Sequence, residues 1–325
     1  MHGAPVQQDD YGDSEQFYQL QLRLGAPYAR QRLGIEQEKQ ASVLSARGKH
    51  VHLENLYSLA SMIRFCLRCT GLYGRAVRNS RKLRLNHNRF AVPHLPTPFE
   101  GFRILHLSDL HLDMDENHLE VLIRSVQPLE YDLCVITGDY RRETWGDTGP
   151  AMAAMARLRP HLKGRVLAVL GNHDSVTMVP ELETMGYEML INEHCAIERG
   201  GERFWVAGVD DAHYYRMDNI QRVVEQLPIG AHSLLLSHTP EIYRQAAHAG
   251  FDLFLCGHTH GGQLCLPGGI PLTLDAKLPR KLGRGAWQHQ QMQGYTSAGS
   301  GTSILNVRLN CPPEITLHTL QRPPE

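Results

Sequence analysis

Residues 102–111 read Phe-Arg-Ile-Leu-His-Leu-Ser-Asp-Leu-His, a short apolar run that ends on an aspartate and a histidine. Such a run predicts a buried strand, and Asp109 and His111 can point the same way from its extended exit. The arrangement recurs, because apolar runs at 133–137, 166–170, 233–237 and 251–256 also end at residues that can bind metal. Sites in open α/β sheets lie at the carboxyl ends of strands, so the pattern predicts one site there.

The polar residues that follow these runs have the chemistry of a two-metal centre. Two divalent cations that clamp a phosphoryl displacement need a bridging carboxylate, and imidazole, carboxylate or amide ligands complete each coordination shell. The sequence offers this set in a fixed order: Asp109, His111, Asp139, Asn172, His238, His258 and His260. Glycines at 138, 171 and 257 allow sharp backbone turns beside them.

Each motif alone is weak evidence for a metal site. A lone histidine such as His238 is more often a core or surface residue than a ligand, and the chain has 19 histidines. The ordered conjunction of five runs, each after an apolar strand, is what favours the metal interpretation. The glycine pairs at 261–262 and 268–269 lack the spacing of nucleotide-binding loops and indicate turns.

The order and spacing resemble the calcineurin-like metallophosphoesterase superfamily, whose pattern is Asp-x-His, Gly-Asp, Gly-Asn-His-Asp/Glu, a lone His, and Gly-His-x-His. The resemblance extends from about residue 86 to the C-terminus. It is most specific in three stretches, at 256–263 (Cys-Gly-His-Thr-His-Gly-Gly-Gln), 266–269 (Leu-Pro-Gly-Gly) and 308–315 (Arg-Leu-Asn-Cys-Pro-Pro-Glu-Ile). These stretches look like the bacterial phosphodiesterase branch, which includes membrane-associated enzymes and relatives that cleave UDP-2,3-diacylglucosamine in lipid A synthesis.

The resemblance implies a role for each candidate residue. Asp139 would bridge two metals, whose remaining ligands would be Asp109, His111 and His260 for one ion, and Asn172, His238 and His258 for the other. His173 matches the catalytic histidine of the family, which faces the leaving group. Asp174 would orient that ring or a ligand. The expected cofactors are two divalent ions, with manganese favoured and zinc, iron or magnesium as alternatives.

The loops near these ligands bear on the substrate. Ser/Thr protein phosphatases of the superfamily read Gly-Asp-x-x-Asp-Arg-Gly, whereas residues 138–143 read Gly-Asp-Tyr-Arg-Arg-Glu, which disfavours a phosphoprotein substrate. Other loop residues near the ligands are candidates for substrate contact: Tyr140, Arg141, Arg142, Asp210 and Asp211.

Composition predicts a globular protein of the cytoplasm. A chain of 325 residues with 42% hydrophobic residues can bury a full core, and a net charge of −1 gives no global attraction to nucleic acid or membrane. Seven cysteines without a dense framework, and no secretory leader, favour a reducing compartment. Cys66-x-x-Cys69 lacks the second half of a zinc site.

Residues 1–85 form a separate N-terminal extension. Disorder is predicted for 1–13, short helices for 14–46, and a basic amphipathic helix for about 55–82 that Gly71 and Gly74 weaken and can divide in two. One face of that helix carries Arg64, Arg68, Arg75, Arg78 and Lys82. The expectation is peripheral contact with an anionic membrane on its inner face. The alternative is a helix packed on the catalytic domain with a solvated basic face. Nucleic acid is disfavoured, since no aromatic residues interleave with the charges.

Residues 86–325 are expected to form the catalytic domain. Helices are predicted at 117–126, 150–159, 179–185, 217–226 and 241–249, and further strands at 204–209, 304–309 and 315–319. The expected fold class is α/β, a four-layer sandwich of two mixed β-sheets flanked by helices, with the helical N-terminal extension.

The predicted function is a dinuclear metal-dependent phosphodiesterase or pyrophosphatase, in which a metal-bridging hydroxide attacks phosphorus. The substrate is a phosphodiester or nucleotide diphosphate, and UDP-2,3-diacylglucosamine is the lipid-linked hypothesis, because the amphipathic helix could reach acyl chains. The alternatives are a phosphodiesterase for soluble cyclic nucleotides or nucleic acid, and a non-enzymatic scaffold of the same fold. Degenerate ligands would mark a scaffold, and none of the expected ligands is missing.

Overall fold

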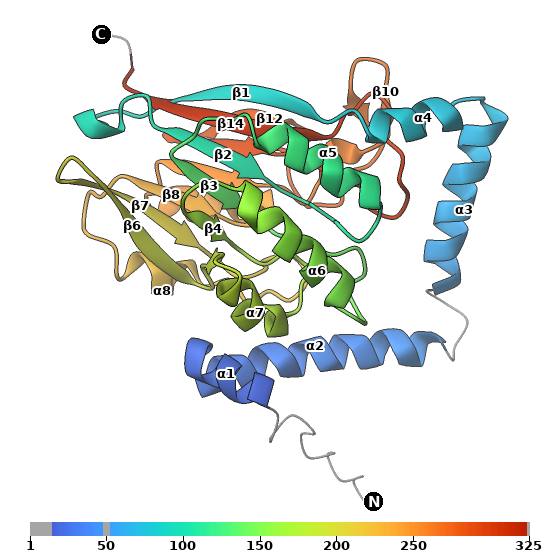
Figure 1. Cartoon of the computed structure of the whole chain (residues 1–325), viewed down its shortest axis with the longest axis horizontal. Coiled ribbons are helices and arrows are strands. Elements are labelled where there is room, and N and C mark those ends of the chain that lie inside the picture. Colours follow the sequence, from blue (N-terminus) through green and yellow to red (C-terminus); the bar gives the residue numbers. More distant parts are fainter. Residues whose placement is uncertain (1–14, 48–52, 324–325) are drawn as a thin grey trace, which may run out of the picture.

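The computed structural model describes residues 15–47 and 53–323, which form two six-stranded mixed sheets stacked face to face (Figure 1). In the first sheet the order is β1 (Arg84–Ala91), β14 (Glu314–Gln321), β2 (Arg103–Leu107), β3 (Leu133–Ile136), β4 (Val166–Ala168) and β5 (Glu188–Met189). In the second it is β12 (Gly285–His289), β13 (Met292–Thr296), β9 (Leu253–Cys256), β8 (Ser233–Leu236), β7 (Glu202–Gly208) and β6 (Glu193–Arg199). A small hairpin pairs β10 (Cys265–Leu266) with β11 (Ile270–Pro271).

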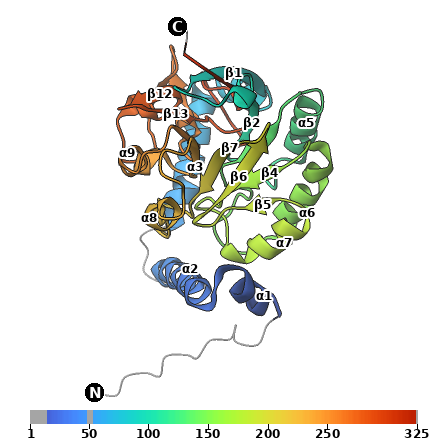
Figure 2. The same cartoon turned by 90° about the vertical axis from the view of Figure 1, so that its left-hand side faces the viewer.

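Helices cover the outer face of each sheet, so the molecule has four layers, as the sequence predicts (Figure 2). The first sheet is covered by α5 (Glu116–Val126), α6 (Gly149–Leu158) and α7 (Val179–Thr184). The second is covered by α8 (Ile220–Val224) and α9 (Tyr243–His248). The five helices predicted in this region are all present, although α8 is shorter than the predicted 217–226.

The central strands are apolar on both faces because both faces are buried. In β2, Leu105 and Leu107 pack with the helices, whereas Ile104 packs between the sheets with residues of the second sheet such as Phe204. Parallel strands buried on both sides read as continuous apolar runs, which is why the sequence revealed them. Strands β2, β3, β4 and β5 are parallel, so their carboxyl ends meet at one edge.

Several strands differ from expectation, and β5, β6, β12 and β13 lie outside the predicted strand ranges. Strand β1 was not predicted, because its sequence RLNHNRFA is polar and it lies at the sheet edge beside β14. The strand predicted at 304–309 is wrong. That segment is a loop with one bridge, between Leu309 and Leu264. Its backbone groups form hydrogen bonds with the Gln263 side chain instead of a neighbouring strand. The N–H of Ser303 donates to Gln263 Oε1, and the carbonyls of Ser303 and Leu305 accept from Gln263 Nε2.

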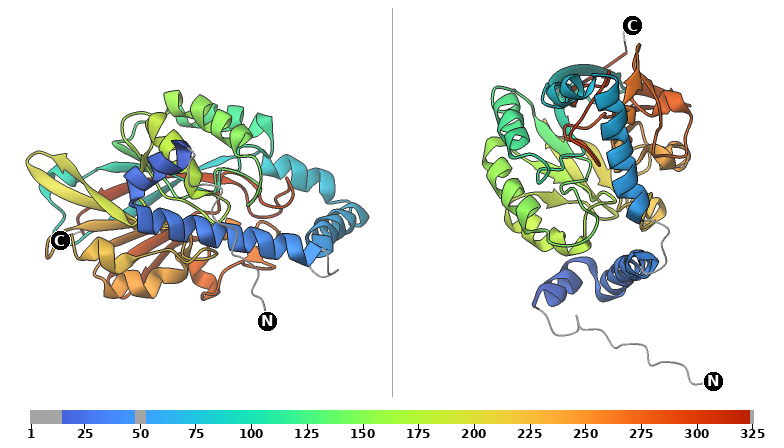
Figure 3. Two further views of the ribbon diagram at one scale, coloured as in Figure 1. Left: turned by 90° about the horizontal axis from the view of Figure 1, so that it is seen from below. Right: turned by 90° about the vertical axis from the view of Figure 1, so that its right-hand side faces the viewer.

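The N-terminal extension wraps two sides of this sandwich. It consists of α1 (Glu15–Leu24), α2 (Ala26–Arg47), α3 (Leu53–Cys69) and α4 (Tyr73–Ser80). Helix α2 crosses the underside of the molecule and α3 stands along its side (Figure 3). Gly71, with φ of 69°, separates α3 from α4, so the basic helix predicted at 55–82 is two helices. The disorder predicted for residues 1–13 falls outside the described residues, and the boundary at 85/86 stays a prediction.

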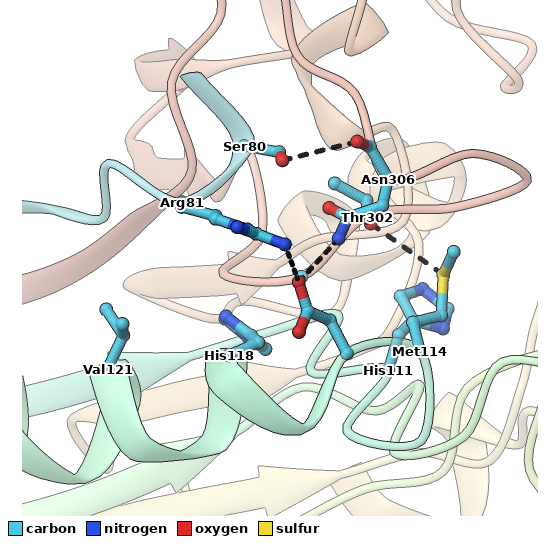
Figure 4. Close-up of a pocket in the computed structure, with 10 residues that line it drawn as sticks. Ser80, Arg81, His111, Met114, His118, Val121, Thr302 and Asn306 are labelled. Atoms are coloured by element: carbon cyan, nitrogen blue, oxygen red, sulfur yellow. Dashed lines mark hydrogen bonds and ion pairs between the residues drawn. The ribbon is translucent and has the colours of Figure 1, made fainter. Parts of the chain in front are cut away.

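Within the described residues, none of the helices has the length and apolarity required to cross a bilayer. Helix α3 packs Leu67, and the partly buried Ile63, against Leu305 and Val307 of the catalytic region. The residue that follows α4, Arg81, meets Asn306 at the start of α5 (Figure 4). There the Asp115 carboxylate accepts a hydrogen bond from Asn306 Nδ2 at 2.7 Å and pairs with Arg81 at 3.4 Å.

Candidate metal centre

One cluster of candidate ligands joins four buried side chains from three strand ends. The ligand atoms of Asp109, His111, Asp139 and His260 lie within 4.8 Å of one another. His111 Nε2 is 3.3 Å from His260 Nε2 and 3.6 Å from Asp139 Oδ2, and His260 Nε2 is 3.5 Å from Asp109 Oδ1. Atoms that converge on one point from residues 109 to 260 have the arrangement of a cation site.

A second cluster shares Asp139 with the first. It joins Asp139, His238 and His258, and His238 Nε2 is 3.3 Å from Asp139 Oδ2 and 3.1 Å from His258 Nδ1. Asn172 completes it, with Oδ1 2.9 Å from His238 Nε2. All seven residues that the sequence predicts as ligands are therefore brought together, in the two groups that the family resemblance implies.

The backbone at these ligands is in an unusual conformation. Asp109, His111, Asp139, His258 and His260 all have positive φ values, between 41° and 70°. A residue with a side chain adopts this left-handed region at a cost of about 1–3 kcal/mol, and such residues concentrate at functional sites. The surrounding sheets hold these five side chains in strained positions from which they reach the common centre.

Two glycines make the close approach of the loops possible. A Cβ at Gly171 would overlap Asp139 Oδ1, and a Cβ at Gly257 would overlap the side chains of Ser108 and Asp109. The motif glycines are thus required by packing against the carboxylates, which agrees with the expected turns beside the metals.

Hydrogen bonds to backbone carbonyls orient the ligand rings. His111 Nδ1 donates to the carbonyl of Arg141 at 2.8 Å, and His238 Nδ1 donates to the carbonyl of Thr137 at 2.7 Å. Each bond leaves Nε2 facing the centre, which is the usual outer contact of a metal-binding histidine.

Asp174 holds the ligand loops together through their backbones. Its carboxylate accepts hydrogen bonds from the N–H groups of Asp139 at 2.7 Å, Tyr140 at 2.9 Å and Gly171 at 2.8 Å. The sequence suggested that it orients the ring of His173 or a ligand. The contacts show that it ties the Gly-Asp loop to the Gly-Asn-His-Asp loop instead.

His173 is placed beside the cluster. Its ring lies edge-on to that of His111, with 5.2 Å between centroids, and its Nδ1 is 3.3 Å from Thr144 Oγ1. Its backbone is held at both ends, because its N–H donates to Asp139 Oδ1 at 3.0 Å and its carbonyl accepts from Arg141 Nε at 2.6 Å.

Arg308 is a residue of the site that sequence reasoning did not single out. Its guanidinium is fully buried and donates to the carbonyls of Gly301 at 2.6 Å and His260 at 3.2 Å, with Nη2 3.3 Å from His260 Nδ1. The only signal in the sequence was that Arg308 begins the stretch 308–315, which resembles the family. Arg308 fixes the ring and backbone of His260.

Four of the five loop residues considered for substrate contact are buried and make contacts within the protein. Tyr140 is buried and donates to the carbonyl of Val169, and Arg141 is buried against the His173 loop. Asp210 and Asp211 are also buried, where they bind α2 and the N–H groups of residues 213–215, respectively. Arg142 is exposed beside Glu143.

The pKa values of the candidate ligands bear on whether they can bind cations. Burial, together with His238, holds the pKa of His258 well below its usual value, and burial with His111 does the same for His260. Burial alone would raise the pKa of Asp139, but His238 and His173 outweigh it and hold that pKa well below normal. Burial lowers the pKa of His238, but the Asp139 carboxylate outweighs burial and raises it to about 10, so this ring must give up its proton to bind a cation. Neutral His258 and His260 beside an ionised shared carboxylate are the forms that bind divalent metals, so the residues fit a two-metal cofactor.

The cluster lies at the floor of a pocket of about 420 Å³. One side is polar and includes Asp139, Asn172 and His173. The opposite side is apolar and is lined by Met62, Ile63, Leu264, Leu272, Ile304, Leu305 and Val307. Helix α3 of the N-terminal extension therefore forms part of the pocket wall.

A two-sheet α/β sandwich with carboxylates and imidazoles at its strand ends is the architecture of a metal-dependent hydrolase. Comparison with known proteins agrees, because the calcineurin-like phosphoesterase family matches residues 102–262. The metallophosphoesterase YkoQ of Bacillus subtilis (strain 168) is 33% identical over 227 residues, which cover 67% of this chain and 83% of that protein. The chain belongs to the calcineurin-like phosphoesterase family and is a metal-dependent phosphoester hydrolase.

Two further relatives differ in length. The phosphodiesterase YaeI of Escherichia coli (strain K12) is 28% identical over 234 residues, covering 66% of this chain and 81% of that protein. A transmembrane protein with metallophosphoesterase domain from Danio rerio is 31% identical over 244 residues, covering 69% of this chain and 54% of that protein.

Proposed function

We propose that the protein hydrolyses a phosphodiester or a phosphoanhydride at a centre of two divalent cations, with manganese as the favoured metal. Asp109, His111 and His260 hold one ion, Asn172, His238 and His258 hold the other, and Asp139 bridges them. The observation that carries this proposal is the position of Asp139, whose Oδ2 lies 3.6 Å from His111 Nε2 and 3.3 Å from His238 Nε2.

The bound cations would lower the pKa of a water molecule and neutralise charge on the phosphoryl oxygens. The chain's own residues set the geometry. Arg308 and the carbonyls of Arg141 and Thr137 keep the ligand rings fixed, which spares reorganisation during the reaction. His173 stands beside this floor and gives a proton to the departing oxygen, or stabilises its charge.

The apolar side of the pocket supports a substrate with a lipid tail. Met62, Leu272 and Ile304 line it, although they are 56%, 53% and 37% exposed. Exposed apolar side chains beside a polar floor suit an amphiphile whose phosphate reaches the metals and whose acyl chain lies on the wall. A lipid-linked nucleotide diphosphate such as UDP-2,3-diacylglucosamine has this form.

The outer face of α3 supports peripheral contact with an anionic membrane at the cytoplasmic face. Phe65 is 67% exposed one turn after Met62, and Arg64 and Arg68 are exposed beside them. Apolar side chains can enter the headgroup region, and each nearby cation adds about 1 kcal/mol. The packed alternative holds for the other face, where Leu67 meets Leu305.

The test is a substrate panel with the full chain and Mn²⁺. Hydrolysis is measured on UDP-2,3-diacylglucosamine, on bis(4-nitrophenyl) phosphate and on a cyclic nucleotide, with metal content determined by elemental analysis. We expect two metals per chain and turnover of the lipid-linked substrate. Activity confined to the soluble esters would remove the lipid assignment, and bound metals without hydrolysis of any ester would favour the scaffold.

A further inference from the structure

Helix α2 carries a fully buried arginine into the catalytic region. Leu20, Ala29 and Leu33 of α1 and α2 belong to the same apolar core as α5, α6 and α7. Beside them lies Arg32, whose side chain has 0% exposure. The first two helices therefore pack as part of the sandwich, although the family match begins only at residue 102.

The partners of Arg32 come from two loops of the catalytic region. Arg32 Nε is 2.8 Å from Asp210 Oδ2, which is also fully buried. The guanidinium lies 3.5 Å from the ring centre of Tyr215, and Nη2 is 3.5 Å from the carbonyl oxygen of Asp174. Arg32 Nη1 pairs with Glu36 on the next turn at 2.6 Å.

Glu36 extends this contact to the residues that follow the Gly-Asn-His-Asp motif. Its carboxylate accepts hydrogen bonds from Ser175 Oγ at 2.7 Å and from the N–H of Val176 at 2.8 Å. These residues come directly after Asp174, which holds the Asp139 and Gly171 backbones. Helix α2 thus forms hydrogen bonds with the residues that directly follow the loop that presents Asn172 and His173.

Asp210 begins the second loop, which reaches the other side of the site. Asp211 accepts hydrogen bonds from the N–H groups of His213 and Tyr215. The His213 ring lies 4.2 Å from the His258 ring, centre to centre, and its Nδ1 is 2.7 Å from Glu241 Oε2. The buried Arg32 guanidinium therefore contacts two loops. One presents Asn172, and the other carries His213, whose ring packs against His258.

We propose that α2 is a positioning element of the metal centre and that Arg32 is its positioning residue. A buried carboxylate whose cation is removed is left uncompensated, so the loop that carries it must move to reach water. Both loops would then shift their ligands, and displacements of about 1 Å can cost a hundredfold in rate. This inference rests on the proposed two-metal function of the same site.

The experiment compares ion pairs at two places on the same extension. Arg32→Met and the milder Glu36→Gln remove the contacts beneath the catalytic loops. Arg23→Met is the matched control, because Arg23 of α1 also pairs across the interface, with Glu183 and Glu193, but far from the two loops in its contacts. For each full-length variant the Mn²⁺ affinity is measured by calorimetry, kcat and KM with bis(4-nitrophenyl) phosphate, and stability by thermal unfolding.

We expect Arg32→Met and Glu36→Gln to weaken Mn²⁺ binding and to lower kcat roughly tenfold or more with little change in KM. Arg23→Met should lower the unfolding temperature and leave both readouts at the wild-type value. If Arg32→Met does not fold, Glu36→Gln decides the matter. Equal loss of stability in all variants with unchanged Mn²⁺ affinity and kcat would overturn the proposal, because α2 would then only staple the fold.

The Mn²⁺ measurement separates this inference from the proposed function. Wild-type chain that binds two Mn²⁺ but hydrolyses no ester would remove the enzymatic proposal, while a loss of affinity confined to Arg32→Met and Glu36→Gln would still support the positioning role. The double variant Arg32→Met/Asp210→Asn adds a check, since it removes both buried charges. Its Mn²⁺ affinity should lie closer to wild type than that of Arg32→Met, and an affinity below that of Arg32→Met would contradict the charge argument.

Discussion

The two sides of the pocket are built in opposite ways. The polar floor consists of side chains at strand ends, where Asp139 and His258 are buried on strained backbones and Asn172 and His173 are half-buried. The apolar wall combines exposed side chains such as Met62, Leu272 and Ile304 with the buried Leu305 and Val307, and it comes from α3 and from two loops, 263–273 and 303–307. The candidate metal ligands thus come from the family core, whereas the N-terminal extension and the loops line the rest of the pocket.

Removal of the shared ligand, Asp139, should abolish both metal binding and hydrolysis at the floor. Asp139→Ala takes a carboxylate from both cation sites, so we expect loss of both metals by elemental analysis and loss of detectable hydrolysis. Retention of two metals per chain in this variant would show that the floor is not organised around Asp139.

His173→Ala should separate chemistry from metal binding within the floor. The ring is beside the ligands but is assigned no metal, so the metal content should stay at the wild-type value. Loss of proton transfer typically costs about 10²- to 10⁴-fold in rate, which steady-state kinetics would detect. Metal loss equal to that of Asp139→Ala would contradict this division of roles.

The wall should matter only for substrates with an acyl chain. Leu272→Ser combined with Ile304→Ser should reduce kcat/KM for UDP-2,3-diacylglucosamine by about tenfold, because two partly exposed side chains together contribute about as much as one fully buried apolar side chain, about 1.5 kcal/mol. Turnover of bis(4-nitrophenyl) phosphate should not change. Ile229→Ser, at an exposed site outside the pocket, is the control. A parallel loss on both substrates would mean that the wall supports the floor rather than the tail.

The smallest effect is expected at the outer rim of the wall. Arg64→Gln should weaken sedimentation with anionic vesicles by roughly fivefold, since each cation contributes about 1 kcal/mol near the surface. Added salt should reduce the wild-type binding in the same way. Arg157→Gln with Arg203→Gln removes two exposed cations elsewhere and should have no effect. Equal binding to zwitterionic vesicles would exclude an electrostatic contact.

Sequence patterns predicted the floor far better than its surroundings. Asp109 and His258 could be placed because each follows a buried strand and the strand ends meet. Asp174 was predicted to orient the His173 ring or a ligand, but a carboxylate beside a histidine does not reveal the three N–H groups that it binds, of which one belongs to Asp139. The loop at 304–309 looked like a strand because its apolar residues face α3, and its hydrogen bonds to Gln263 leave no mark in the local pattern.

The contact between Arg32 and Asp210 was out of reach for a different reason. An arginine in a polar helix predicts a solvated face, and only the fold brings it to an aspartate far along the chain. Its apolar neighbours, Leu33 and Ala29, gave the only hint that this side of α2 is covered.

The separation of 178 residues between Arg32 and Asp210 has a consequence for biosynthesis. At about 5–20 residues per second, a ribosome needs roughly 10 to 40 seconds between making the two partners. During that interval Glu36, one helical turn away, is the ion-pair partner of Arg32 that has already been made. Arg308, which fixes the last ligand His260, follows that ligand by 48 residues, so a nascent chain cannot hold a fully supported centre until Arg308 has also been made.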